Sequence, residues 1–142
     1  MVLHPAHYAQ VAVNNMEFSE KLKNMRIAKG WSQEELAERS GISRRTIQNY
    51  ERFGTLPKKR STYGVLAKTF GVDESVLLDR NVDFVLRANE QYGNDAMRQA
   101  MDLVADVKAL WAGGEMEEED MDEIMRALQE AYMEAKSRGR GD

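Results

Sequence analysis

The sequence predicts an all-α protein, and three observations support this class. Apolar residues recur every three or four positions over most of the chain, which is the period of an amphipathic helix. Ser stands where two of these segments would begin, and Gly stands where several would end. Two longer apolar stripes follow in the last third of the chain. We therefore expect five short helices over residues 17–79 and a helical hairpin over residues 94–138.

The composition narrows the class of protein further. Apolar residues make up 42% and charged residues 31% of 142 residues, which is typical of a folded globular chain. The absence of cysteine excludes disulfides and thiolate metal sites. No apolar run approaches the roughly 20 residues that span a bilayer, and residues 1–15 lack the Lys or Arg of a secretory signal. We expect a cytoplasmic protein.

Charge is divided unevenly along the chain. Residues 1–87 hold 14 Lys/Arg and 10 Asp/Glu, a net of +4, whereas residues 88–142 hold 6 and 14, a net of -8. Residues 43–60 alone carry six positive groups against Glu51, a net of +5. A basic first part and an acidic second part indicate different roles.

The first three predicted helices are defined by their ends. The first runs from Phe18 towards Gly30, and its inward residues are expected to be Phe18, Leu22, Met25 and Ile27. Ser32 and Glu35 have the spacing of a capping box, which opens a short helix that Gly41 ends. Ser43 can cap the next helix, which ends at Gly54 and Pro57.

Two more short helices complete residues 17–79. The inward residues of the fourth helix are expected to be Tyr63, Leu66, Ala67 and Phe70. The fifth helix, after Gly71, is expected to contribute the apolar residues Val76 and Leu77. Residues 80–93 are predicted to be a linker, because Val82, Phe84 and Leu86 alternate as in a short extended segment. Residues 1–16 are expected to form a flexible arm and residues 139–142 a frayed tail.

Residues 33–51 have the pattern of two short helices that meet at a steep angle. Ala37 is small enough for a close approach, and Gly41 can adopt the positive φ of a tight turn. An apolar wedge between the helices would consist of Leu36, Ile42, Ile47 and Tyr50. Together these positions predict a helix-turn-helix.

The stretch "SQEELAERSGISRRTIQNYE" resembles the DNA-binding motif of the Cro and phage-repressor (Xre-like) family. The resemblance extends over about residues 18–79, and the hairpin that follows resembles an extension found on some of these regulators. It implies a lambda-repressor-like domain that docks its second motif helix, residues 43–53, in the major groove of double-stranded DNA.

The resemblance also implies which residues touch DNA. The base-reading positions would be Arg44, Arg45, Gln48 and Asn49. Arg can bond guanine O6 and N7 together, and Asn or Gln can pair with adenine. Contacts with the DNA backbone would come from Gln33, Ser43, Thr46, Lys58, Lys59 and Arg60. The alternative for the basic residues is an ordinary solvated surface.

Two further positions are expected to serve structure. Arg26 and Glu51 match family positions that pair across the first and third helices, with surface placement as the alternative. Trp31 is expected to fill the core rather than to stack on a base. The chain departs from the family pattern after Glu51, where Phe53 is inserted before Gly54.

The hairpin is the candidate dimerisation device. Its first helix would place apolar residues along "DAMRQAMDLVADVKALWA", and its second, after Gly113 and Gly114, keeps a heptad-like stripe. The predicted contact residues are Met97, Met101, Val104, Leu110, Trp111, Met121, Ile124, Met125, Leu128 and Tyr132. Docking on the N-terminal domain, or binding another protein, are the alternatives.

The residues give no support for an enzyme. The only histidines, His4 and His7, lack further ligands nearby, and no glycine-rich phosphate loop or Cys/His nucleophile is present. We expect neither metal nor cofactor. Two hypotheses stand: a repressor that binds an inverted repeat as a homodimer, and an antitoxin-like or anti-regulator module that binds another protein and binds DNA secondarily.

Overall fold

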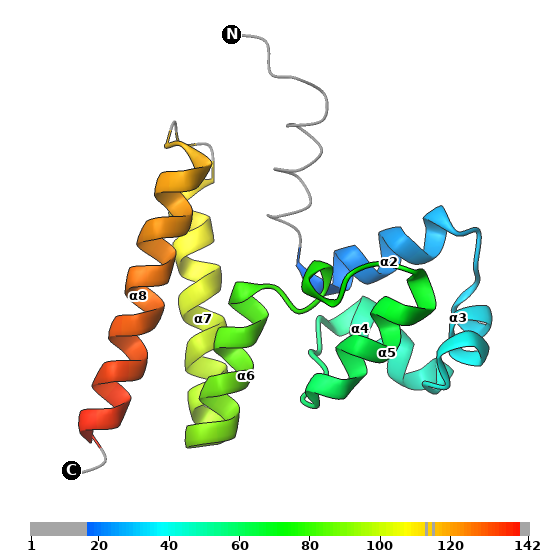
Figure 1. Cartoon of the computed structure of the whole chain (residues 1–142), viewed down its shortest axis with the longest axis horizontal. Coiled ribbons are helices and arrows are strands. Elements are labelled where there is room, and N and C mark those ends of the chain that lie inside the picture. The colour runs from blue at the N-terminus through cyan, green and yellow to red at the C-terminus, as the bar shows by residue number, and fades with distance from the viewer. Residues whose placement is uncertain (1–16, 113, 115, 140–142) are drawn as a thin grey trace, which may run out of the picture. The chain divides into compact units, whose positions relative to one another are not determined.

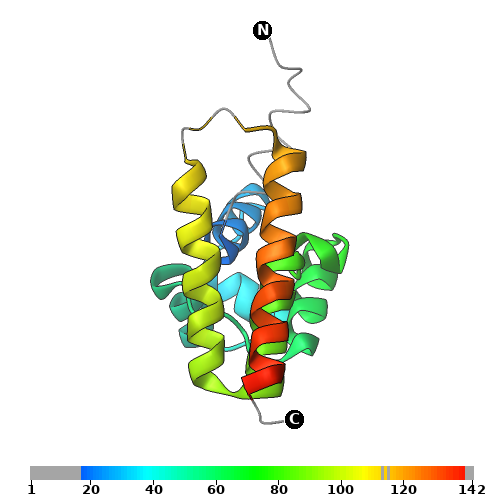
Figure 2. The same ribbon diagram turned by 90° about the vertical axis from the view of Figure 1, so that its left-hand side faces the viewer.

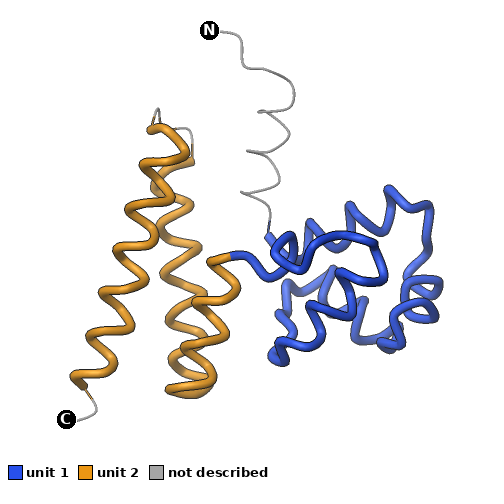
Figure 3. The backbone as a smooth tube through the Cα atoms, viewed as in Figure 1, with its two compact units in different colours: residues 1–79 blue, residues 80–142 orange. Residues whose placement is uncertain are grey.

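Helices make up the regular structure of the described residues, as the sequence predicts, so the all-α fold class is confirmed. The structure is a computed structural model that describes residues 17–112, 114 and 116–139 (Figure 1). The arm predicted over residues 1–16, with His4 and His7, lies outside this range, as do Gly113 and residues 140–142. The chain divides into two compact units, residues 1–79 and residues 80–142 (Figure 3).

In the first unit, the described residues 17–79 form four α-helices and one 3-10 turn. They are α2 (Phe18–Ala28), α3 (Gln33–Ser40), α4 (Arg44–Phe53), α5 (Arg60–Phe70) and η1 (Glu74–Val76). The fifth predicted helix is thus a single 3-10 turn, which begins where the Asp73 side chain accepts from the Ser75 backbone N–H at 2.9 Å. Helix α4 packs against α2 and α3, and α5 packs against α3 and η1.

The core of the first unit is formed by the predicted inward residues. Phe18 lies edge-on to both Tyr50 and Tyr63, with ring centroids 5.8 and 5.4 Å apart, so three helices meet at one aromatic cluster. The other buried apolar residues of this unit are Leu22, Leu36, Ile47, Leu66, Ala67, Phe70 and Leu77. The prediction for Ile27 was wrong, since this side chain is 56% exposed near the end of α2.

In the second unit, the residues that the structure describes form three helices instead of the predicted linker and hairpin. Helix α6 (Arg80–Tyr92) occupies residues expected to be extended, and it packs against both α7 (Asn94–Trp111) and α8 (Glu118–Gly139). The linker prediction for residues 80–93 was therefore wrong. Helices α7 and α8 lie side by side and run in opposite directions, as expected for the hairpin (Figure 2).

Burial within α6 accounts for the wrong prediction. The alternating residues Val82, Phe84 and Leu86 are all buried, but so are Val85 and Ala88 between and beyond them. The alternation of three buried residues resembles a strand, and it conceals the helical spacing of the polar residues Asp83, Arg87 and Glu90. The tail prediction also shifts, because Gly139 is the last residue of α8.

The turn between α3 and α4 gives a direct test of the fold. Gly41 has a φ of 78°, and a Cβ added there would meet no atom within 4 Å, so only the backbone conformation disfavours a side chain. We expect Gly41→Ala to lower the free energy of unfolding by about 1 kcal/mol, measured by urea denaturation.

Gly64 is the matched control for this substitution. It lies within α5 without a positive φ, and an added Cβ would lie 3.8 Å from the Glu74 carboxylate, an ordinary contact. Gly64→Ala should raise the free energy of unfolding by about 0.5 kcal/mol, because Ala is the better helix former. Equal effects of the two substitutions would contradict the turn geometry.

Candidate nucleic-acid interface

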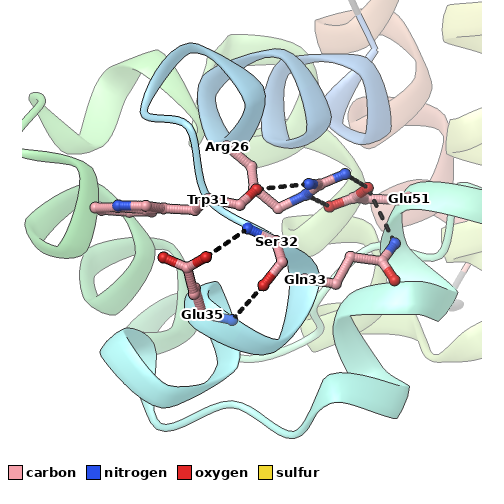
Figure 4. A network of polar contacts seen from close by, with 6 residues as sticks. All are labelled: Arg26, Trp31, Ser32, Gln33, Glu35 and Glu51. Atoms are coloured by element: carbon pink, nitrogen blue, oxygen red, sulfur yellow. Dashed lines mark hydrogen bonds and ion pairs between the residues drawn. The ribbon is translucent and has the colours of Figure 1, made fainter.

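The corner between α3 and α4 is built from local signals. The Ser32 hydroxyl accepts from the Glu35 backbone N–H at 3.0 Å, and the Glu35 carboxylate accepts from the Ser32 N–H at 3.4 Å (Figure 4). This capping box fixes the start of α3, and the left-handed Gly41 ends it. Leu36 and Ile47 are fully buried, so the apolar wedge holds the two helices together. Ile42 is half-buried.

The outward face of α4 carries the predicted base-reading residues. Arg44 and Arg45 are exposed at the start of the helix, and Gln48 and Asn49 are half-buried one turn later. Arg45 and Asn49 are four residues apart and lie on the side of α4 opposite the buried Ile47. The structure therefore brings these four polar side chains to one end of one helix.

The cap of α4 uses two residues predicted to contact the DNA backbone. The Ser43 hydroxyl accepts from the Thr46 backbone N–H at 3.1 Å and donates to Thr46 Oγ1 at 2.8 Å. Ser43 is thus committed to starting the helix. Thr46 Oγ1 accepts in this pair, so its own hydrogen is able to donate outward.

A buried polar network connects the corner to α2. Arg26 Nε and Nη2 donate to the two carboxylate oxygens of Glu51 at 2.8 and 2.9 Å, which is a bidentate pair (Figure 4). The side chains of Arg26 and Glu51 are only 12% and 4% exposed. The hydrogen bonds to Glu51 raise the pKa of Arg26 above its ordinary value, although burial acts in the opposite direction.

Two more hydrogen bonds extend this network. Arg26 Nη1 donates to the backbone oxygen of Trp31 at 2.8 Å, which holds the turn before α3. Gln33 Nε2 donates to Glu51 Oε1 at 3.2 Å, so the amide is oriented by the same carboxylate (Figure 4). Spacing along the chain gave no signal for this contact, because Gln33 and Glu51 are 18 residues apart.

Trp31 contacts an aromatic ring and a guanidinium group within the first unit. Its ring lies parallel to that of Phe70, with centroids 5.6 Å apart, and the Arg39 guanidinium lies 4.5 Å from the Trp31 centroid on the surface. The half-buried Trp31 therefore packs within the unit, between a core ring and a cation.

The loop after α4 presents the second basic run. Lys58 and Lys59 are exposed, and Arg60 is half-buried as the first residue of α5. The buried Tyr63 hydroxyl donates to the Pro57 backbone oxygen at 2.7 Å, which anchors the loop, and burial is the main cause of the raised pKa of Tyr63. The inserted Phe53 is 68% exposed, and the Arg52 guanidinium lies 5.3 Å from its ring centroid.

The residues predicted to form a dimer interface fall into two groups in the second unit, one buried and one at least partly exposed. Met97, Val104 and Met125 are buried within one copy, so they are not available to a partner. The exposed members are Met101, Leu110, Ile124 and Leu128, and the half-buried ones are Trp111, Met121 and Tyr132. The third helix, α6, which the sequence did not predict, explains why much of the hairpin's apolar surface is covered internally.

No group of three or more His, Cys, Asp or Glu is arranged to hold a metal ion among residues 17–112, 114 and 116–139. Over the same residues, none of the helices combines the length and apolar character required to cross a bilayer.

Comparison with known proteins identifies the first unit. Residues 22–77 match the protein family described as Helix-turn-helix, and this range includes the whole of α3, α4 and α5. No curated protein and no solved structure matches the chain.

The Arg26–Glu51 pair can be tested by unfolding. Glu51→Ala leaves a buried guanidinium without its carboxylate, and we expect the free energy of unfolding to fall by about 3 kcal/mol. Replacing both partners by apolar residues, Arg26→Met with Glu51→Leu, should recover much of this loss because no charge stays buried. Urea denaturation measures both.

The exposed pair of Arg98 and Asp95 serves as the control. Their side chains are 73% and 86% exposed with a 3.0 Å contact, so Asp95→Ala should cost less than about 1 kcal/mol. If Glu51→Ala were no more destabilising than Asp95→Ala, the pair would not hold the corner.

Proposed function

We propose that the chain is an Xre-like helix-turn-helix regulator, and that it acts as a repressor that binds an inverted-repeat operator as a homodimer; the match of residues 22–77 to the helix-turn-helix family supports the DNA-binding part of this proposal. The observation that carries the proposal is the arrangement of α4. Its first turns hold two exposed arginines and two amides on the side away from the core. Buried contacts at the α3–α4 corner keep this helix fixed.

Base reading is assigned to Arg44, Arg45, Gln48 and Asn49. A helix that enters the major groove by its N-terminal end brings its first two turns to the base edges. The guanidinium groups would take guanine, and the amides would take adenine. Because Arg44 with Gln48, and Arg45 with Asn49, each lie four residues apart, two adjacent rows of side chains can follow successive base pairs.

Backbone contacts are assigned to the residues around this helix. Gln33 opens α3, and since Glu51 engages one amide hydrogen, the other is directed to a phosphate near the helix N-terminus. Thr46 donates its hydroxyl hydrogen to a second phosphate. The basic run of Lys58, Lys59 and Arg60 supplies positive charge along the same strand. These contacts position the protein without reading sequence.

A homodimer follows from the small size of one recognition unit. A single helix reads few base pairs, and a second copy related by a twofold axis doubles the site. The two α4 helices would then lie in successive major grooves about 34 Å apart, or a multiple of that distance.

Arg45→Ala is expected to weaken binding to the best operator by about 1–3 kcal/mol and to relax the base preference at one position. The operator would be selected from random DNA, and binding would be measured by fluorescence anisotropy on the operator and on its single-base variants. Equal losses on every sequence would contradict base reading by Arg45.

Two lysine variants serve as comparisons for the Arg45→Ala measurement. Lys59→Ala should weaken binding to all sequences alike and reduce the slope of log K against log salt by about 1. Lys68 is also exposed, but it lies in the last turn of α5, so Lys68→Ala should leave the operator affinity nearly unchanged.

The twofold arrangement predicts a spacing rule. Insertion of about 5 base pairs between half-sites rotates one half-site to the opposite face of DNA, and should reduce binding to that of a single half-site. Insertion of about 10 base pairs returns both half-sites to the same face of the DNA and should recover part of the affinity. Equal binding to both spacings would show that the copies bind independently.

The second candidate function is a protein-interaction module, and one observation favours it. The second unit leaves Leu110 79% exposed in the last turn of α7, beyond the helix-turn-helix domain. In this case the acidic unit would bind a different protein. A chain that stays monomeric without such a protein would favour this candidate.

A further inference from the structure

Helix α8 is long but buries little of its surface. It has 22 residues, of which only Met125 and Gln129 are buried. Two contacts fix how it is turned about its axis. Gln129 Nε2 donates to Asn81 Oδ1 of α6 at 2.8 Å, and the Tyr132 hydroxyl donates to Gln99 Oε1 of α7 at 2.8 Å. The inner face of α8 is therefore committed to its own unit.

A second stripe runs along α8 beside this inner face. Its positions are separated alternately by four and three residues, which is the spacing of a coiled-coil seam. We call them the α8 seam: Glu117, which directly precedes α8, and the α8 residues Met121, Ile124, Leu128, Ala131, Ala135 and Arg138. Ile124 and Leu128, at its centre, are each 39% exposed. Ala131 and Ala135 are exposed and small, which permits another helix to approach closely.

The charges at the two ends of the seam indicate which helix can pack against it. The N-terminal end carries Glu117 and an acidic first turn, and the C-terminal end carries Lys136 and Arg138. A second copy of α8 in antiparallel orientation sets each acidic end beside a basic end, and it also opposes the helix dipoles favourably. A parallel copy would set like charges together.

Nucleic acid and anionic membranes do not fit this surface. Residues 80–142 hold 8 Lys/Arg and 15 Asp/Glu, a net of -7, so the unit repels polyanions. The self-complementary pattern of one helix is the simplest match to a twofold-related copy, in which residue i meets residue j and j meets i.

We propose that two copies of the chain associate through antiparallel α8 seams, with Ile124 and Leu128 near the twofold axis and Glu117 of each copy near Arg138 of the other. This inference rests on the proposed homodimer and assigns its interface. It excludes the buried Met97, Val104 and Met125, which fill the interior of each copy.

Sedimentation equilibrium of the full chain without DNA tests the proposal. We expect a dimer for the unmodified chain and a monomer at the same concentration for Leu128→Glu, because the twofold axis sets two carboxylates against each other. The control is Ala105→Glu, which adds the same charge at an exposed position of α7 outside the seam. A dimer that persists in Leu128→Glu, with unchanged circular dichroism, overturns the proposal.

Charge reversal tests the orientation. Glu117→Arg and Arg138→Glu should each raise the dimer dissociation constant about tenfold at low salt, since each creates two like-charge contacts per dimer. The double variant should return it close to the original value. Arg138 also pairs with Glu134 in its own helix, so Glu134→Gln is made alongside to measure the loss of that contact alone.

The outcomes separate this inference from the proposed DNA function. A parallel seam predicts no weakening by single reversals, and that result overturns the antiparallel arrangement. A chain that is monomeric at all concentrations, yet selects a DNA sequence, overturns the seam and leaves base reading intact. A dimer that dissociates as predicted but prefers no DNA sequence supports the seam and contradicts the base-reading assignment.

Discussion

The carboxylate of Glu51 is the constraint on which the first unit depends. It is almost fully buried on α4, and it receives hydrogen bonds from Arg26 on α2 and Gln33 on α3. A buried carboxylate costs several kcal/mol unless it is paired, so α4 is stable only when turned towards Arg26. Arg44 and Arg45 lie on the same helix two turns earlier. The Arg26–Glu51 pair makes no contact with Arg44 and Arg45, but it fixes the rotation of α4 and therefore the direction in which these two side chains extend.

The corner itself could be predicted from the sequence because its signals are local. Ser32 with Glu35, Gly41, and Ser43 each act within a few residues along the chain, and each forms the expected cap or turn. Such features are decided by neighbouring backbone groups before any long-range packing. The buried residues Leu36, Ile47 and Tyr50 follow from helical spacing once these ends are fixed.

Helix α6 could not be predicted in this way. Its residues Val82, Phe84, Val85, Leu86 and Ala88 are all buried, and the alternation of three of them conceals the polar stripe of Asp83, Arg87 and Glu90, whose spacings of four and three residues are those of a helix. The same helix decides which hairpin residues are interior. Sequence reasoning identified the apolar positions of α7 and α8 but could not divide them between the unit's core and its surface. Likewise, the contacts of Gln33 with Glu51 and of Tyr63 with Pro57 depend on three-dimensional packing.

In each unit, polar contacts between helices orient an outward surface. In the first unit the Arg26–Glu51 pair orients α4, and in the second the buried Gln129 amide, bonded to Asn81, orients α8. Apolar packing alone permits a helix to rotate among several similar arrangements, whereas a buried amide without its partner costs about 1–3 kcal/mol. Gln129 thereby keeps Met125 inside and leaves Ile124 and Leu128 at the surface. Polar contacts between helices thus orient both α4, in the basic part of the chain, and the α8 seam, in the acidic part.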